Sequence, residues 1–578
     1  MVVAGLVYLG GFVGRGWVAF DEGQLGQSAL YVLNGALPHV GYQESYTGGL
    51  AFLYAWLFAL TGIELLHIRW LLFAGAAWCL TLVYVICRRY LPPLGAALAT
   101  WVALVWSFPN YLSGLPSWWL LICAVTSLWA IICHGETGRW SFLAMAGLSA
   151  GVAFALKQTG AYLIMAVVLA VAFNGTVAHP AMGAWVARLL GCAALVFPML
   201  LVWARLNAAE GLYLVLPIAA LAAVMWFHGV RRAAATPTLF RDALAVLVPA
   251  TLPVIALLAP YAATGTLGSF FDGAFVQPFA RVSNASYRMP SVIPALMIGL
   301  PVYAVALASR DAAARLHRLV FWPLIVGLAA IVPLDLRPYH AVWQSVRSLT
   351  LILPLYFVAR VAITRTAHTP QHATIFASLT VLAFTSLNQY PFAVPVYFAY
   401  TAPLLIIGAV VCLVSWGVSP RLLAPWGVML TLVGVVSLNR GFLYALGRAH
   451  DPITVDTPLA LPRAHLTLLQ EHAVGYQAIV GAIQAHIGNG RLVAGPDCPE
   501  MFFLTRRFNA SGVMYEFMVP QGSPGRAIYE FDAWRNASVI VINHSPDFSP
   551  PLAPSLVDRL RLEFSRSTTV LQFEVRWR

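Results

Sequence analysis

Charged residues are scarce in this chain of 578 residues: only 10% are Asp, Glu, Lys or Arg, and lysine occurs once, as Lys157. Soluble globular proteins carry about 25% charged residues, so this scarcity excludes an ordinary soluble enzyme. Instead, 60% of the residues are hydrophobic, and the mean hydropathy is +0.77. The composition therefore predicts a chain embedded in a lipid bilayer.

Cysteine is also sparse, and the seven cysteines form no CxxC pair and no Cys/His spacing of a zinc site. A disulfide scaffold or a structural metal site is therefore not indicated. The net charge of +12 lies mostly in short loops between apolar runs. Because no compact basic domain and no basic stripe with interleaved aromatics is present, we expect no nucleic-acid partner.

Long apolar runs fill the chain up to about residue 440. A membrane-spanning helix needs about 20 predominantly apolar residues, which predicts about fifteen spans here, or 13–15 within the error of the method. The predicted spans are 2–20, 68–87, 93–108, 115–133, 141–156, 160–174, 188–205, 211–228, 243–260, 291–308, 317–334, 348–364, 372–387, 399–416 and 424–440. A shorter apolar stretch, 49–62, fits a helix lying at the membrane surface.

Arginines set the predicted orientation. With a cytoplasmic N-terminus, each inside loop carries at least one arginine, from Arg88 and Arg89 in the first to Arg421 in the last, as the positive-inside rule requires. The first stretch lacks a basic leader and a cleavage site, so we expect a retained anchor. An odd number of spans then places the C-terminus outside. The pattern predicts a multi-pass protein of the cytoplasmic (inner) membrane with an extracytoplasmic, periplasmic tail.

The composition changes at about residue 441, where a mixed, water-soluble pattern begins. Helical and alternating patterns predict, in order, a helix over 468–487, strands at 491–495 and 537–544, a helix over 554–564 and a last strand at 568–577. We therefore expect two domains. Residues 1–440 form a mostly α transmembrane bundle whose first outside loop is 21–66, and residues 441–578 form a small soluble α/β domain.

The first outside loop reads FDEGQLGQSALYVLNGALPHVGYQESYTGGL and holds three carboxylates, Asp21, Glu22 and Glu44. Carboxylates at a membrane surface can act as a general base on an acceptor hydroxyl, or bind a divalent cation such as Mg²⁺ or Mn²⁺. The alternative is structural, because Asp21 could cap the helix that QLGQSALYVL predicts.

An apolar first span, Asp-Glu-Gly, Asn-Gly-x-Leu-Pro and a Tyr- and Gly-rich entry to an apolar helix resemble the GT-C membrane glycosyltransferases. The resemblance is to the branch related to protein O-mannosyltransferases and lipid A aminoarabinose transferases, and it covers the first span through about Lys157. It implies that an acidic residue of the first loop is the catalytic base or a metal-site residue, which matches Asp21 with Glu22 beside it. Many relatives have His-Lys-Pro-Pro where this chain has Tyr46-Thr47-Gly48-Gly49, and often a second aspartate where it has Asn110 and Ser117. Glu44 is a candidate substitute.

Lys157 and Gln158 lie in a tight predicted outside turn that interrupts a long apolar run. A lysine there is costly unless it extends to the interface or meets an anion. Both alternatives stay open from the residues alone. The resemblance implies that this turn lies near the phosphate of the sugar donor.

Outside basic residues form a second candidate anion site, because positive charge on that side is not needed for topology. A phosphate donor needs such groups to neutralise its leaving phosphate, while pairing with Asp272, Asp335 or lipid headgroups is the structural alternative. The candidates are Arg281, Arg288, Arg337, His340 and Arg347. The segment LNQYPFAVPVYFAYTAPLL, which contains Tyr397, reads as an aromatic belt or as aromatics flanking a sugar or lipid tail.

Together these features predict a membrane glycosyltransferase that moves a sugar from a polyprenyl-phosphate donor to a glycan, lipid or protein by an inverting single displacement. No nucleotide-binding motif is visible. A multi-span transporter or lipid flippase is the main alternative and predicts ionisable residues deep within several spans. A non-catalytic assembly protein is a third possibility. An Ala- and Arg-rich chain with one lysine indicates a GC-rich bacterial genome.

Overall fold

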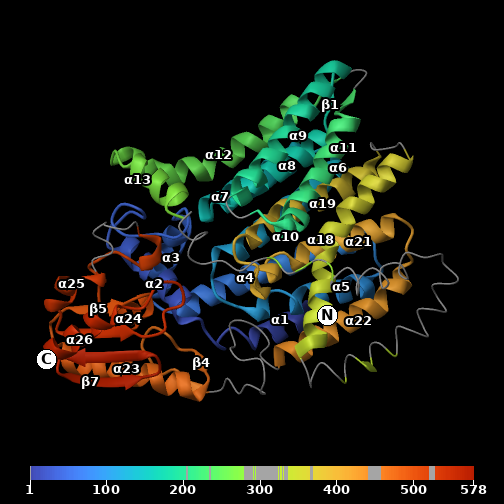
Figure 1. The fold of residues 1–578 in the computed structure, drawn as a ribbon. Helices are drawn as coiled ribbons and strands as arrows, with labels where there is room; N and C mark the ends of the chain where they lie inside the picture. The colour runs from blue at the N-terminus through green and yellow to red at the C-terminus, as the bar shows by residue number, and fades with distance from the viewer. Residues whose placement is uncertain are drawn as a thin grey trace.

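The computed structural model describes residues 2–203, 206–232, 236–278, 336–364, 369–439, 457–519 and 528–578, with a few isolated positions between 289 and 330. A bundle of long helices occupies one side of the molecule, and a small domain of strands and helices, built from the C-terminal residues, occupies the other (Figure 1). Helices α2 (Ala19–Leu33) and α3 (Gly49–Thr61) lie between the two parts.

Within the described residues, seven helices are long and apolar enough to cross a membrane. They are α4 (Leu65–Cys87), α6 (Pro116–Thr137), α9 (Pro180–Val202), the continuous run of α10, a π-turn and α11 (Ala208–His228), α12 (Leu239–Ala263), α18 (Leu336–Thr364) and α22 (Pro420–Asn439). Shorter apolar helices complete the bundle: α5 (Pro93–Val105), α7 (Trp140–Leu156), α8 (Gly160–Asn174), α19 (Pro370–Ser386) and α21 (Ala402–Ser415). The prediction of a polytopic helical membrane protein is confirmed. The predicted spans 291–308 and 317–334 lie outside the described residues, apart from isolated positions.

The N-terminal helix is much shorter than predicted. Helix α1 covers only Val2–Gly10, and the chain then turns through a glycine-rich stretch before α2 begins at Ala19. Within this stretch, Gly16 has a φ of +65°, a backbone conformation that favours glycine. Asp21 therefore lies inside the first turn of α2, whose N-cap is Val18, so the structural alternative in which Asp21 caps this helix is wrong.

Helix α3 brings the first outside loop against the end of α7. A Cβ at Gly49 would lie 2.2 Å from the carbonyl oxygen of Ala155, so only glycine allows this approach. Thr47 Oγ1 donates to the same carbonyl at 2.6 Å. Trp56 and Leu60, on the other side of α3, are exposed, as expected for a short helix at a membrane surface.

The C-terminal part contains a four-stranded sheet in the order β5-β6-β8-β7, with β5 (Leu492–Gly495) parallel to β6 (Val539–Asn543) and the remaining pairs antiparallel. Helices α23 (Gln470–Ile487) and α26 (Pro554–Glu563) match the predicted helices. The predicted last strand is instead a hairpin, β7 (Arg566–Val570) and β8 (Phe573–Trp577), which turns at Leu571 with a φ of +55°. The predicted boundary near residue 441 lies outside the described residues.

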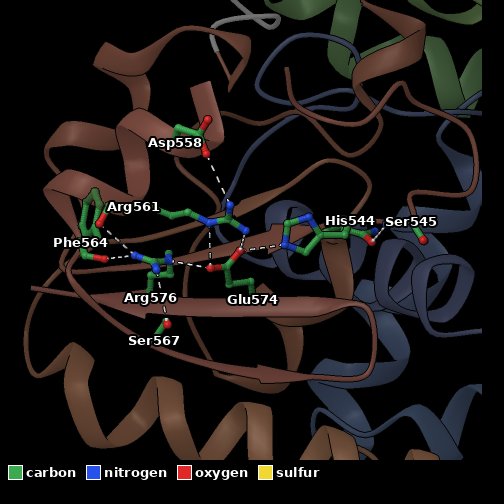
Figure 2. A network of polar contacts seen from close by, with 9 residues as sticks. His544, Ser545, Asp558, Arg561, Phe564, Ser567, Glu574 and Arg576 are labelled. Carbon is green, nitrogen blue, oxygen red and sulfur yellow. Dashed lines mark hydrogen bonds and ion pairs between the residues drawn. The ribbon is translucent and has the colours of Figure 1, made fainter. Parts of the chain in front are cut away.

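An ion-pair network fastens β8 to its surroundings (Figure 2). Glu574 accepts hydrogen bonds from Arg576 Nε at 2.7 Å and Arg561 Nη2 at 3.2 Å, and His544 Nε2 lies 2.8 Å away. Burial raises the pKa of Glu574, but these three partners outweigh burial and lower the pKa to about 2. The network joins β8 to α26 and to the loop after β6.

Helix α2 packs closely on α24 (Pro499–Leu504) of the C-terminal part. A Cβ at Gly23 would lie 2.5 Å from the backbone of Glu500, and one at Gly26 would lie 2.5 Å from the ring of Phe503. The glycines of α2 therefore let the C-terminal domain rest directly on the helix that carries Asp21.

Candidate active site

Asp21 lies where the segment between α1 and α3 meets the segment between α5 and α6 (Pro116–Thr137). It is half-buried in the first turn of α2, and Tyr111 donates a hydrogen bond from Oη to Asp21 Oδ2 at 2.7 Å. Tyr111 follows α5 and is itself buried, and its carbonyl oxygen accepts from Trp118 Nε1 at 2.7 Å. The sequence did not single out Tyr111, because a tyrosine between two spans reads as part of an aromatic belt.

Glu22 has a different environment from its neighbour. Its two carboxylate oxygens accept from Nε and Nη2 of Arg69 at 2.8 and 2.6 Å, and both side chains are 2% exposed. Arg69 also donates to the carbonyl oxygens of Val13, Arg15 and Gly16, in the stretch between α1 and α2. The ion pair holds the start of α2 against the preceding stretch. Asp21 is not part of this ion pair, and its surroundings are compatible with those of a general base.

Lys157 is held inside the protein, between α7 and α8. It is 7% exposed, and its Nζ donates to Ser117 Oγ at 2.8 Å and to Asn388 Oδ1. The rings of Tyr46 and Tyr397 lie 5.6 and 5.8 Å from the same nitrogen. The amine is therefore buried among side chains of the protein and does not extend from its surface.

Arg347 is a second buried cation, on α18, and is 1% exposed. Its guanidinium donates to Gln389 Oε1 at 2.6 Å and to the carbonyl oxygen of Ala393 at 3.2 Å, and Met289 Sδ lies 2.9 Å away. In the part of the chain that the structure describes, Arg347 has no carboxylate partner and its Nε has no hydrogen bond. Pairing of the outside arginines with Asp272 was the structural alternative; for Arg347 the described residues show no such pair, and Asp272 Oδ2 accepts from Gln277 Nε2 at 3.0 Å. Asp335 lies outside the described residues.

One segment, 387–400, contacts both cations. Asn388 and Gln389 are neighbours, and the first binds Lys157 while the second binds Arg347. Tyr397 and Phe398 are also neighbours, and their rings lie near Lys157 and Arg347 respectively, at 5.8 and 5.9 Å. Segment 387–400 therefore contributes one amide and one aromatic ring to the surroundings of each cation.

Glu44, Tyr46 and Gln158 belong to the same region. Glu44 is 4% exposed, and its Oε1 accepts from Ser45 N at 2.8 Å and from Tyr46 N at 3.3 Å. Gln158 Nε2 donates to the carbonyl oxygens of Ala274 at 2.9 Å and Ser45 at 3.4 Å. Gln158 thus ties the first outside loop to the turn that carries Lys157.

The remaining candidates cannot be placed. Arg281 and Arg288 lie outside the described residues, and the structure describes only the backbone of Arg337 and His340, in α18. Among the described residues, no group of three or more His, Cys, Asp or Glu side chains is arranged to hold a metal ion. Of the two carboxylates proposed for a cation, Glu22 accepts from Arg69 with both oxygens, and Asp21 accepts from Tyr111 with Oδ2.

The structure adds Tyr111, Ser117, Asn388 and Gln389 to the candidate site. Ser117 opens α6 and was noted only as a departure from relatives, and the two amides lie in a segment that reads as an aromatic belt. By contrast, Asn110 has a structural role, because its Nδ2 donates to the carbonyl oxygens of Val105 and Ser107 at the end of α5. Polar residues at the end of a predicted span, just inside it as Ser117 or just outside it as Asn388, were the signal that could have found the others.

Comparison with known proteins gives similar folds at low identity. No protein family and no curated protein matches the chain. Its structure is similar to ArnT from Cupriavidus metallidurans bound to undecaprenyl phosphate, with 13% identity and a TM-score of 0.38 over 100% of this chain and 96% of that one. It is also similar to the apo oligosaccharyltransferase of Archaeoglobus fulgidus, with 11% identity and a TM-score of 0.40 over 94% of this chain and 69% of that one. AglB from the same organism, in complex with an inhibitory peptide and a dolichol-phosphate, matches with 10% identity and a TM-score of 0.39, over 93% and 69%.

Proposed function

We propose that this protein is a membrane glycosyltransferase that moves a sugar from a polyprenyl-phosphate donor to an acceptor hydroxyl. The observation that carries the proposal is the pair of buried cations, Lys157 and Arg347, held by the neighbouring amides Asn388 and Gln389 beside the loop that bears Asp21.

The surroundings of Arg347 favour an anionic ligand. Burying a charge is costly unless it is paired, and among the described residues the groups that contact this arginine are an amide, a carbonyl oxygen, a thioether and aromatic rings. A phosphate group supplies the missing negative charge and can accept several hydrogen bonds. An apolar polyprenyl chain attached to that phosphate would remain in the bilayer.

Asp21 is the proposed general base. The acceptor hydroxyl attacks the anomeric carbon of the donor, the bond from that carbon to the phosphate oxygen breaks, and the proton of the hydroxyl passes to Asp21. The polyprenyl phosphate leaves as an anion, stabilised by Lys157 and Arg347. A single displacement of this kind inverts the configuration at the anomeric carbon.

The reaction would take place at the outer face of the cytoplasmic membrane, with the C-terminal domain outside. The contact of that domain with α2 supports a role in binding the acceptor, whether glycan, lipid or protein. The alternative of a transporter predicts charged residues deep in several spans. In the described residues, Lys157 and Arg347 instead bind neighbouring residues of one segment, which lies next to the predicted first outside loop.

Release of free polyprenyl phosphate tests the proposal. Purified protein would be given undecaprenyl-phosphate hexoses and pentoses together with crude membrane acceptors. We expect wild type to release the carrier and Asp21→Asn to lose about 100-fold or more of the rate, the usual size of a general-base contribution. Gln27→Glu, which places a carboxylate elsewhere on α2, is the control: combined with Asp21→Asn it should not restore activity. Equal rates for wild type and Asp21→Asn would remove Asp21 from the reaction, and no release with any sugar would contradict the function.

If the reaction needs a divalent cation, we propose that Asp21 binds it. If Mg²⁺ or Mn²⁺ is required, EDTA will abolish carrier release and added metal will restore it. If the cations Lys157 and Arg347 suffice to stabilise the leaving phosphate, EDTA will leave the rate unchanged. We predict the second result, because Glu22 accepts from Arg69 with both oxygens and Glu44 accepts from the backbone amides of Ser45 and Tyr46.

A further inference from the structure

A polar stripe runs along one face of α2, starting at Asp21. Asp21, Gln24 and Ser28 are spaced at i, i+3 and i+7, which places them on the same side of a helix. Gln24 and Ser28 are both buried. Gln24 Nε2 donates to Ser45 Oγ at 2.7 Å and to Glu44 Oε1 at 3.4 Å, so the stripe leads from the proposed base to Glu44.

Three buried hydroxyls lie around Glu44 with few hydrogen-bond partners. Within the described residues, the hydroxyl of Tyr261, whose side chain is 0% exposed, makes no hydrogen bond, and the hydroxyls of Ser28 and Tyr42, 3% and 4% exposed, bond only to each other. The Glu44 carboxylate interacts electrostatically with both tyrosine hydroxyls, and the Ser28 hydroxyl lies beside that of Tyr42. The groups come from three elements: α2, the first outside loop and the end of α12.

Packing alone does not account for this arrangement. A buried hydroxyl without a partner is unfavourable, and native structures contain few of them. Phenylalanine and alanine would fill the same space without that cost. The Glu44 carboxylate would repel an anionic ligand, and the hydroxyls would gain no hydrogen bonds from an apolar ligand. A ligand with several adjacent hydroxyls satisfies all of them, because each sugar hydroxyl can both donate and accept.

We propose that Ser28, Tyr42, Glu44 and Tyr261 form the subsite for the sugar ring of the donor, an inference that rests on the proposed function. Tyr46 links this subsite to the phosphate side. Its backbone N donates to Glu44 Oε1 at 3.3 Å, and its ring lies 5.6 Å from Lys157 Nζ. The sugar ring would bind to the hydroxyl cluster while its phosphate contacts the lysine. Asp21 lies at the other end of the α2 stripe, where the acceptor approaches.

Binding of two lipids that differ only in the sugar tests this subsite. Native mass spectrometry would give dissociation constants for undecaprenyl phosphate and for its hexose and pentose esters. We expect wild type to bind at least one ester more tightly than the bare phosphate. Tyr261→Phe and Tyr42→Phe each should lose about tenfold of the affinity for that ester and keep the affinity for undecaprenyl phosphate, because each removes one hydroxyl contact.

Tyr8→Phe is the matched control, because Tyr8 on α1 also has a buried hydroxyl that bonds to none of the described residues, outside the proposed site. It should change neither constant. Unchanged ester binding in both tyrosine variants, or no preference of wild type for any ester over undecaprenyl phosphate, would overturn the sugar subsite and leave the transferase standing. Failure of wild type to bind either lipid would overturn the proposed function itself, and this inference with it.

Discussion

At the scale of single residues, removing the hydrogen bond from Tyr111 to Asp21 tests whether Asp21 is the general base. A donor to a carboxylate stabilises its charged form. Without that donor, the acid limb of the pH-rate profile should move to higher pH. In Tyr111→Phe we therefore expect the limb to shift upward and kcat at neutral pH to fall about tenfold, the size of effect of one hydrogen bond to a charged group. A profile identical to wild type in a folded variant would show that Asp21 does not titrate in the reaction.

Glu22 and Arg69 give a residue-scale prediction about stability. Glu22→Gln leaves the buried Arg69 guanidinium without its counter-charge, and removing one partner of a buried pair costs about 3–5 kcal/mol. We expect a clear loss of thermal stability in detergent. The folded fraction should keep its turnover rate, because Glu22 braces the helix and does not contact the reacting atoms. A stable but inactive variant would assign the chemistry to Glu22 instead.

The residue-scale chemistry was only partly visible in the sequence. Asp21 and Lys157 stood out because a charge at the edge of an apolar run is costly, which is a local property. Ser117 and Asn388 did not, because their importance comes from contacts between residues distant in sequence. Glu22 looked equivalent to Asp21 until the structure placed Arg69 opposite it.

At the scale of elements, segment 387–400 is the feature that joins the two cations. Replacing Asn388 with Asp would place a carboxylate in contact with Lys157, and this internal ion pair would compensate the positive charge of the lysine. We expect binding of undecaprenyl phosphate to weaken about tenfold to 100-fold with no loss of thermal stability, because the new ion pair compensates for the buried charge. Gln389→Glu is the matched change at Arg347 and should act in the same direction. Unchanged lipid binding in both variants would argue against an anion at this segment.

Element boundaries show where pattern reasoning succeeds and fails. Helix α23 and strand β6 lie within two residues of their predicted bounds, because each has a clear period. The hairpin of β7 and β8 was missed because its turn, at Leu571 and Gln572, contains neither glycine nor proline. The break after α1 was missed because hydropathy ignores the backbone preferences of its glycines.

At the scale of the whole molecule, the contact between the C-terminal domain and α2 contains buried carboxyls. Burial raises the pKa of Glu500 from about 4.5 to about 8, with Asp547 and Asp497 nearby adding to the shift. Burial likewise raises the pKa of Asp547 to about 6. A carboxyl whose pKa is raised on folding contributes its full stability below about pH 4.5, and this contribution falls as pH rises towards the folded pKa.

We therefore predict that thermal stability declines between about pH 5 and about pH 9, and that Glu500→Gln, which cannot ionise, removes part of the decline. Melting temperatures of both proteins over this range would measure the effect. Parallel pH curves for wild type and the variant would mean that Glu500 stays ionised in the folded protein.

The general architecture followed from composition, because a bilayer imposes helices of fixed length on an apolar chain. The close fit between the C-terminal domain and α2 did not, since it depends on what Gly23 and Gly26 contact in space. That fit makes the first outside loop the meeting point of the bundle and the C-terminal domain, and it places Asp21 at their junction.

The most direct test of this account is the dissociation constant of undecaprenyl phosphate for wild type and for Lys157→Met, measured by native mass spectrometry on detergent-purified protein. Methionine is apolar and of similar length, so it should be tolerated in this buried position while removing the positive charge. The account predicts that the variant remains folded and binds the lipid at least tenfold more weakly than wild type. Equal binding by the two proteins would contradict the claim that Lys157 holds the phosphate of the donor.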